Sequence, residues 1–156
     1  MFKPGGSLNT GIGVARLGGK CVFVDIDPKT YNIDTDRIAE AVTERTKAIV
    51  PVHLFGQSAE MDALLEIGRT RGLPVIEDAA HAVGTAFRGR PVGSGEEIAV
   101  FSFHPIKNIT TGEGGMVTTQ DQALADRMKV LRFHGVSKDS WARYGRSGSP
   151  RYEVIE

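Results

Sequence analysis

The chain has 156 residues, of which 40% are hydrophobic and 24% are charged, which is the composition of a globular domain with a sizeable core. Lysine and arginine number 19, as do aspartate and glutamate, and the formal net charge of zero gives no support for binding to nucleic acid or to a membrane surface. Because no apolar run reaches the roughly 18 residues of a membrane span and no signal peptide is recognisable, we expect a cytoplasmic protein.

The first part of the chain alternates predicted strands with predicted helices. Residues 1–19 hold six glycines and show no steady period, so only a short helix is expected near their end. Residues 21–25 form an apolar run that is typical of a strand covered on both faces. Asp34 is the predicted N-cap of a helix, and a second apolar strand is predicted over residues 47–54.

The alternation continues into the middle of the chain. Residues 59–71 have a helical pattern that Gly72 closes, and residues 73–77 form a third apolar strand. A polar, glycine-rich loop comes next over residues 82–97, and another strand is predicted over residues 98–103. The β-α-β-α-β order is typical of a doubly wound α/β layer, in which ligands gather at the carboxyl ends of the strands.

The last part of the chain has a weaker pattern. A short strand is predicted over residues 115–119, and an amphipathic helix is predicted over residues 121–133, where Gly135 stops it. Residues 136–156 are polar and have no clear core face, so we interpret them as a tail.

Two candidate catalytic side chains come directly after predicted strands. Asp78 falls just past the third strand, where the sheet would hold a carboxylate rigidly and the two alanines after it would admit a flat ring. Lys107 comes after the strand over residues 98–103, and a lysine that forms a Schiff base must be unprotonated, which is easier where it is partly desolvated. Each residue also has an ordinary explanation, since an aspartate there can cap a turn and a lone lysine is normally a surface residue.

Further polar residues are weaker candidates for a ligand site. His53 lies near the end of the second strand, Ser102 could donate to a phosphate, and His81 taken alone is more often a structural histidine. The glycines of residues 110–115 (TTGEGG) permit close backbone approach, but the Gly-Lys-Ser/Thr ending of a P-loop is missing. No zinc-ligand spacing, dinucleotide-binding glycine motif or serine nucleophile elbow is present, so we expect no metal.

Taken together and in order, these segments resemble one protein family. They are similar to the sugar aminotransferases of the DegT/DnrJ/EryC/StrS type, which are pyridoxal 5'-phosphate enzymes of the aspartate-aminotransferase fold. The resemblance implies an incomplete three-layer α/β/α large domain of a fold-type I transferase with a mostly parallel sheet. The matching segments are VFVDIDPKTYNID (22–34), KAIVPVHLFGQSAEMDAL (47–64), VIEDAAHAVGT (75–85), FSFHPIKNITTGEGGMVTT (101–119) and RFHG (132–135).

The resemblance implies a role for each candidate residue. Lys107 would be the Schiff-base lysine, and Asp78 would form a charge-assisted bond to the pyridinium nitrogen. His81 stands where many relatives carry glutamine, near the ring oxygen of the cofactor, and Ser102 would bind the cofactor phosphate. Related dehydratases carry histidine in place of the lysine, so the presence of Lys107 favours amino transfer over dehydration.

The reaction implied is transfer of an amino group, with glutamate as the expected donor, to the keto group of a nucleotide-linked sugar. Such a step would serve polysaccharide or lipid A biosynthesis, and the full-length enzyme would be a homodimer. Two alternatives stay open: a non-catalytic truncated remnant of such an enzyme, or a related pyridoxal-phosphate dehydratase or lyase.

The resemblance also predicts what the chain lacks. Family members are more than twice as long, so we interpret residues 1–16 as an atypical N-terminal segment and residues 17–135 as a partial cofactor-binding large domain. Residues 136–156 would then lead toward an absent C-terminal domain. In relatives, residues outside the part that matches this chain also contact the cofactor phosphate. We therefore expect residues 1–156 alone to bind the cofactor weakly and to be inactive as an aminotransferase.

Overall fold

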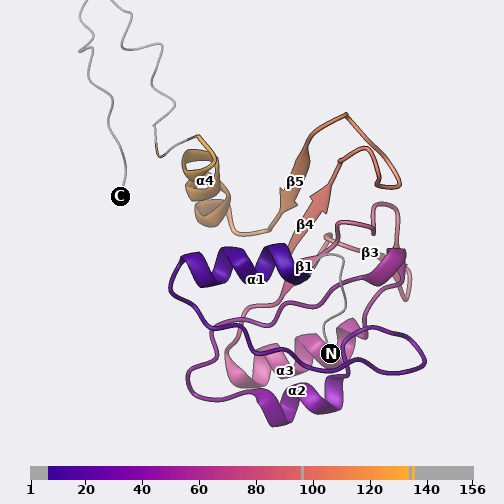
Figure 1. The fold of residues 1–156 in the computed structure, drawn as a ribbon, viewed down its shortest axis with the longest axis vertical. Coiled ribbons are helices and arrows are strands. Elements are labelled where there is room, and N and C mark those ends of the chain that lie inside the picture. The colour runs from indigo at the N-terminus through magenta and orange to yellow at the C-terminus, as the bar shows by residue number, and fades with distance from the viewer. Residues whose placement is uncertain (1–6, 96, 134, 136–156) are drawn as a thin grey trace, which may run out of the picture. The chain divides into compact units, whose positions relative to one another are not determined.

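The computed structural model describes residues 7–95, 97–133 and 135 (Figure 1). The chain divides into two compact units, Met1–Thr118 and Thr119–Glu156. None of the helices in the described ranges is long and apolar enough to cross a lipid bilayer. The helices are α1 (Ser7–Arg16), α2 (Thr35–Ala41) and α3 (Met61–Arg71) in the first unit and α4 (Gln122–Leu131) in the second.

A small mixed sheet forms the centre of the first unit. Strand β1 (Ile76–Asp78) pairs in parallel with β4 (Ile98–Ser102), with Asp78 opposite Val100. Strand β5 (Gly115–Thr118) pairs antiparallel with β4. On the other side of β1, residues 49–52 run parallel to it through two isolated bridges. The predicted strand over residues 47–54 is therefore present only as a partly paired, extended segment.

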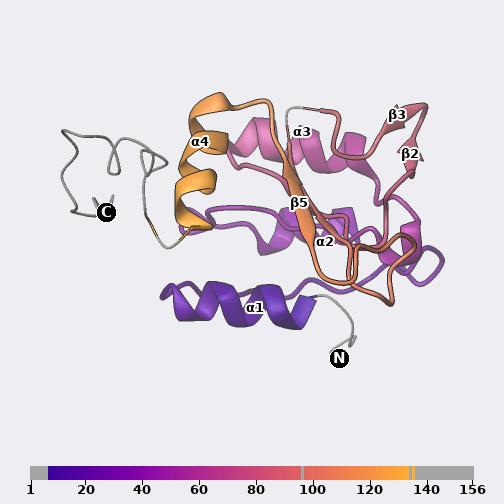
Figure 2. The same ribbon diagram turned by 90° about the horizontal axis from the view of Figure 1, so that it is seen from above.

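Helices cover the strands on two sides. Figure 2 shows α1 on one side of the strands and α3 on the other, which is the layering expected of an α/β/α domain. Helices α2 and α3 contact each other. The expected α/β architecture is confirmed, in a reduced form that has one central sheet and a short separate hairpin.

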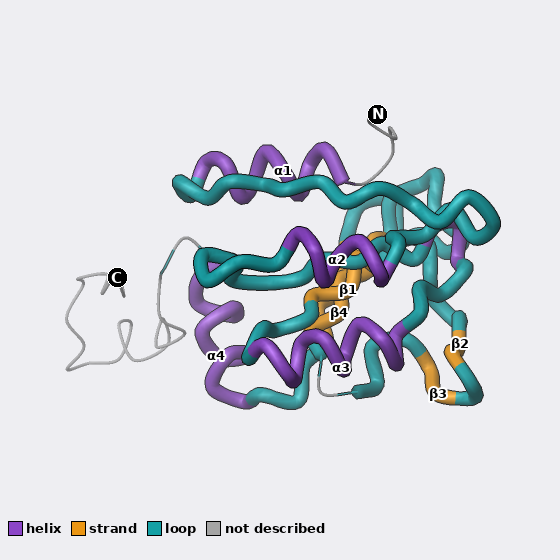
Figure 3. Tube along the Cα trace, turned by 90° about the horizontal axis from the view of Figure 1, so that it is seen from below, coloured by secondary structure: helices purple, strands orange, loops and turns teal. Residues whose placement is uncertain are grey.

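The prediction of a strand over residues 21–25 is wrong, because the structure has no strand in this segment. Figure 3 shows this segment as a loop after α1, and the nearest bridge joins Ile26 to Ile33 instead. Val22 and Phe23 are 65% and 56% exposed. An apolar run becomes a strand only where a second backbone lies within hydrogen-bond distance. Residues 21–24 line the same cavity as the extended residues 49–52 but form no bridge with them.

The predicted helix ends agree closely with the structure. The Asp34 carboxylate accepts a hydrogen bond from the Asp36 N–H and caps α2, as predicted. Helix α3 ends at Gly72, whose φ of 62° is the left-handed conformation that glycine adopts without strain. Asp121 caps α4 by accepting from the Leu124 N–H.

Two further predictions from the sequence have different outcomes. The loop predicted over residues 82–97 contains a short antiparallel hairpin, β2 (Ala86–Phe87) and β3 (Arg90–Pro91), which the glycine-rich composition concealed. The tail predicted over residues 136–156 lies outside the described residues.

Two groups of buried side chains hold the strand ends in place. Burial of large side chains such as Leu64 and Met61 stabilises the fold by about 1.5–3 kcal/mol each. The first group packs α2 and α3 against the strands and consists of Ile38, Ile49, Ala59, Met61, Leu64 and Val75. The second lies beside β4 and consists of Ala79, Ala82, Ala99 and Phe101. Together they make a rigid base for the loops that leave β1 and β4.

Candidate active site

The ends of three parallel backbone segments meet at one edge of the sheet. Asp78 is the last residue of β1, Ser102 is the last residue of β4, and His53 comes directly after the extended residues 49–52. The His53 N–H donates to the Asp78 carbonyl at 3.0 Å, and the Asp78 N–H donates to the Pro51 carbonyl at 2.8 Å. This is the edge at which ligands bind in parallel α/β sheets.

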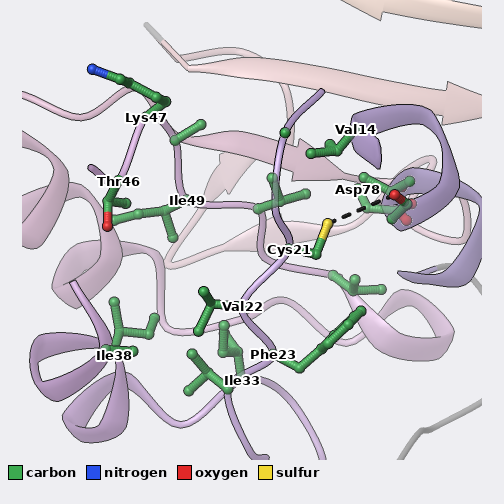
Figure 4. A pocket seen from close by; sticks show the side chains of 18 of the residues that line it. Val14, Cys21, Val22, Phe23, Ile33, Ile38, Thr46, Lys47, Ile49 and Asp78 are labelled. Atoms are coloured by element: carbon green, nitrogen blue, oxygen red, sulfur yellow. Dashed lines mark hydrogen bonds between the residues drawn. The ribbon is translucent and has the colours of Figure 1, made fainter. Parts of the chain in front are cut away.

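A cavity of about 750 Å³ opens at this edge. Its polar wall includes Asp78, His81 and Lys107, together with His53. Much of the remaining lining is apolar; it comes from α1, residues 21–24, α2 and the segment after α2 that includes residues 49–52, and Figure 4 shows part of it. The volume lies within the range of small-molecule sites. Ser102 is not among the lining residues, and its Oγ accepts from the His104 N–H at 3.4 Å.

Lys107 reaches the cavity from the loop after β4. The loop closes on the Phe103 carbonyl, which accepts from the Thr111 N–H at 3.1 Å. Asn108 Nδ2 donates to the Val83 carbonyl at 2.9 Å and holds the loop against the turn after β1. Lys107 is half-buried, and its Nζ lies 2.8 Å from His81 Nε2. Lys107 is therefore a partly buried residue of the cavity wall and not a fully exposed lysine.

Asp78 faces the same cavity with a half-buried side chain. Its Oδ1 accepts from the Ala80 N–H at 3.2 Å, so it also shapes the turn after β1, as the ordinary explanation for this residue predicted. The Ala79 N–H donates to the Val100 carbonyl at 2.9 Å, which ties that turn to β4. One carboxylate thus combines a structural hydrogen bond with a position on the cavity wall.

His81 is stacked on Phe55, a residue that no sequence pattern singled out. The two ring centroids are 5.8 Å apart and the ring planes differ by 14°. Phe55 is 82% exposed and has a φ of 52°, which is uncommon for a bulky residue. The only sequence signal for this turn is Gly56 directly after it, and that signal does not predict an aromatic contact.

A second missed feature is a buried pair behind the cavity. His53 Nε2 lies 2.6 Å from Glu77 Oε2, and the two side chains are 0% and 1% exposed. Because His53 Nδ1 accepts from the Ala59 N–H at 3.1 Å, we assign the ring proton to Nε2, which donates to Glu77. Glu77 Oε1 has no hydrogen-bond partner among the described residues.

No cluster of three or more His, Cys, Asp or Glu side chains in the described ranges could hold a metal ion. Of the four residues to which the family resemblance assigned roles, Lys107, His81 and Asp78 line one cavity. Ser102 ends a neighbouring strand at the same edge of the sheet without lining that cavity.

Comparison with known proteins places this site in context. The chain is 52% identical over 141 residues to the spore coat polysaccharide biosynthesis protein SpsC of Bacillus subtilis, and the match covers 90% of this chain and 36% of SpsC. The crystal structure of DesI with its TDP-sugar product is 44% identical with a TM-score of 0.77, and the match covers 83% of this chain and 33% of DesI.

A third relative is DesV of S. venezuelae, whose structure was solved in complex with a ketimine intermediate. It is 38% identical with a TM-score of 0.82, and the match covers 90% of this chain and 38% of DesV. The chain thus spans about a third of the length of each of these three proteins. Residues 8–150 match the sequence profile of one family along almost the whole chain. The chain therefore belongs to the DegT/DnrJ/EryC1/StrS aminotransferase family.

Proposed function

We propose that this chain carries the cofactor-binding residues of a pyridoxal-phosphate aminotransferase that moves an amino group from glutamate to a nucleotide-linked keto-sugar. The observation that carries the proposal is the meeting of an amine, an imidazole and a carboxylate, from Lys107, His81 and Asp78, in one cavity at the carboxyl ends of the strands. Family membership makes use of this cofactor the expectation.

The residues present fit the cofactor. Lys107 and Asp78 both line the cavity, and Ala80, which also lines it, adds little bulk beside a flat ring. We assign Lys107 to covalent attachment, Asp78 to the ring nitrogen, His81 to the ring oxygen and Ser102 to the phosphate. When bound, the cofactor supplies an electron sink for the carbon from which a proton is removed.

The protein's own contribution would be binding and proton transfer. The negative charge of Asp78 favours a protonated ring nitrogen, because a charge-assisted hydrogen bond stabilises that form. Lys107 Nζ, when not bonded to the cofactor, would act as the acid–base group that moves a proton between the substrate carbon and the cofactor carbon.

The substrate and the setting are proposed from the relatives. DesI was crystallised with a TDP-sugar product, and SpsC is named for polysaccharide biosynthesis. We therefore propose a nucleotide-linked sugar as the acceptor, glutamate as the donor, and a homodimer in the cytoplasm as the working form. The presence of Lys107, where related dehydratases carry histidine, favours amino transfer over dehydration.

The test is a titration with pyridoxal phosphate, monitored by the visible absorbance of the attached cofactor. The wild-type chain should develop the band and Lys107→Ala should not. Lys47→Ala is the matched control, because Lys47 also lines the cavity but its side chain is exposed and extends away from it (Figure 4). Asp78→Asn should weaken binding by roughly 10- to 100-fold, since a charge-assisted bond contributes about 1.5–3 kcal/mol.

Amino transfer is then tested with glutamate on a loaded full-length enzyme that contains this chain, because residues 1–156 alone are expected to be inactive. The visible band should disappear as the amino group passes to the cofactor, and Asp78→Asn should slow its loss. A band that persists would favour the non-catalytic alternative, and a band that survives in Lys107→Ala would refute the attachment site.

A further inference from the structure

Lys107 and His81 are in direct contact, with Nζ of Lys107 2.8 Å from Nε2 of His81. The ammonium form of lysine has only donors, so in that form Nε2 accepts and the ring proton of His81 lies on Nδ1. The lone pair of an imidazole nitrogen, which is a common general base in enzymes, therefore points at the nitrogen proposed for cofactor attachment.

The imidazole is held in this orientation by Phe55. The two rings are stacked with centroids 5.8 Å apart and planes 14° from parallel. Phe55 has a left-handed backbone conformation, and the turn that contains it is stabilised by hydrogen bonds to the side chain of Asn32, which is 4% exposed. Asn32 Oδ1 accepts from the Leu54 N–H at 3.1 Å, and Asn32 Nδ2 donates to the Ser58 carbonyl at 3.0 Å.

The other side of the turn is fixed against His81 itself. Thr85 Oγ1 donates to the Gly56 carbonyl at 2.7 Å. A Cβ atom added to Gly56 would stand 3.0 Å from the His81 carbonyl oxygen, so the two backbones are in close contact. A bulky residue in a sparsely populated conformation that its surroundings enforce is characteristic of functional sites.

We propose that His81 is the proton acceptor for Lys107 when the cofactor aldehyde attaches, and that Phe55 is a positioning residue for the His81 ring. This inference rests on the proposed function of Lys107 and adds to it a role for His81 that precedes any contact with the bound cofactor. Asp78 lines the same cavity, and its carboxylate would favour a transient positive charge on the imidazole.

The step balances without any further reagent. A bond forms between Lys107 Nζ and the aldehyde carbon, and the carbon–oxygen double bond breaks. His81 Nε2 takes the first proton from the ammonium and returns it to the departing oxygen. Two of the three ammonium protons leave in water, and the third stays on the nitrogen of the new carbon–nitrogen double bond. The total charge is unchanged, and nothing is oxidised or reduced.

The test measures the rates of attachment and release of pyridoxal phosphate in the cofactor-free chain by stopped-flow absorbance. In His81→Gln both rate constants should fall on the order of 100-fold, the usual contribution of a general base. The dissociation constant should change little, because a catalyst accelerates both directions equally. Phe55→Leu should slow both rates to a smaller extent. His104→Gln, which changes an exposed histidine near Lys107, should match the wild type.

Two outcomes would overturn the proposal. If the His81→Gln chain attaches pyridoxal phosphate as fast as the wild type, His81 is not the proton acceptor. If the dissociation constant rises only because release becomes faster, His81 contacts the bound cofactor but does not catalyse its attachment. In His81→Ala, shown to be folded by circular dichroism, added imidazole should restore the attachment rate, and no restoration would also refute it. Failure of the proposed function would be seen in a different measurement, the titration of Lys107→Ala with pyridoxal phosphate, where the visible band of the attached cofactor would persist.

Discussion

The buried pair of His53 and Glu77 gives a prediction about the stability of the site. The two side chains are 0% and 1% exposed, and their polar atoms lie 2.6 Å apart. Glu77→Leu would leave the His53 N–H buried without an acceptor. Leaving a buried donor without a partner costs about 1–3 kcal/mol, which is a substantial part of the roughly 5–15 kcal/mol that stabilises a small domain.

Glu77→Gln is the matched control for this change. Glutamine keeps an oxygen that can accept from His53 Nε2 and loses only the charge, so the expected cost is about 1 kcal/mol. In the double variant Glu77→Leu with His53→Phe, both polar groups are replaced by apolar ones. The double variant should therefore be more stable than Glu77→Leu alone, although the Ala59 N–H loses its acceptor.

Urea denaturation monitored by far-ultraviolet circular dichroism measures these free energies of unfolding. We predict the order of stability wild type, Glu77→Gln, double variant, Glu77→Leu. With the single variant His53→Phe measured as well, strict additivity of Glu77→Leu and His53→Phe would show that the pair is not energetically coupled. Equal stability of Glu77→Gln and Glu77→Leu would contradict the hydrogen bond itself.

Two further predictions concern the frame around the site. Gly68→Ala should lower the free energy of unfolding by about 1–3 kcal/mol in thermal denaturation, because its Cβ would stand 2.9 Å from the Leu73 carbonyl oxygen; a neutral result would contradict this packing. The pKa of Asp27 is lowered from 3.8 by hydrogen bonds from the N–H groups of Thr30 and Lys29. Its stabilisation is therefore present above pH 3.8 and lost as pH falls through the lower folded-state pKa, so the melting temperatures of the wild type and Asp27→Asn should converge in acid. A difference in melting temperature between the wild type and Asp27→Asn that does not change with pH would refute this role of Asp27.

The positions at the strand ends were predictable because an apolar run fixes where a buried strand stops. Asp78 and Lys107 come after two such runs, and parallel pairing of β1 with β4 then brings both residues to one edge of the sheet. Capping chemistry located the helix ends for similar reasons, as Asp34 and Gly72 show. These features depend on local sequence, which a single chain displays in full.

The features that were missed depend on contacts between distant segments. Phe55 and His81 are 26 residues apart in the chain, and nothing in either segment encodes their stacking. His53 and Glu77 are 24 residues apart, and each alone has several ordinary explanations. The strand expected over residues 21–25 failed for the same reason, since its apolar pattern says nothing about whether a partner backbone lies beside it.

The most direct test of the proposed site is to locate the lysine that holds the cofactor. The wild-type chain is incubated with pyridoxal phosphate and reduced with borohydride, and the modified peptide is identified by mass spectrometry. We predict that the label lies on Lys107, which faces His81 inside the cavity, and not on exposed lysines such as Lys29 and Lys47. A label spread evenly over the surface lysines, or concentrated on one of them, would contradict the proposed site.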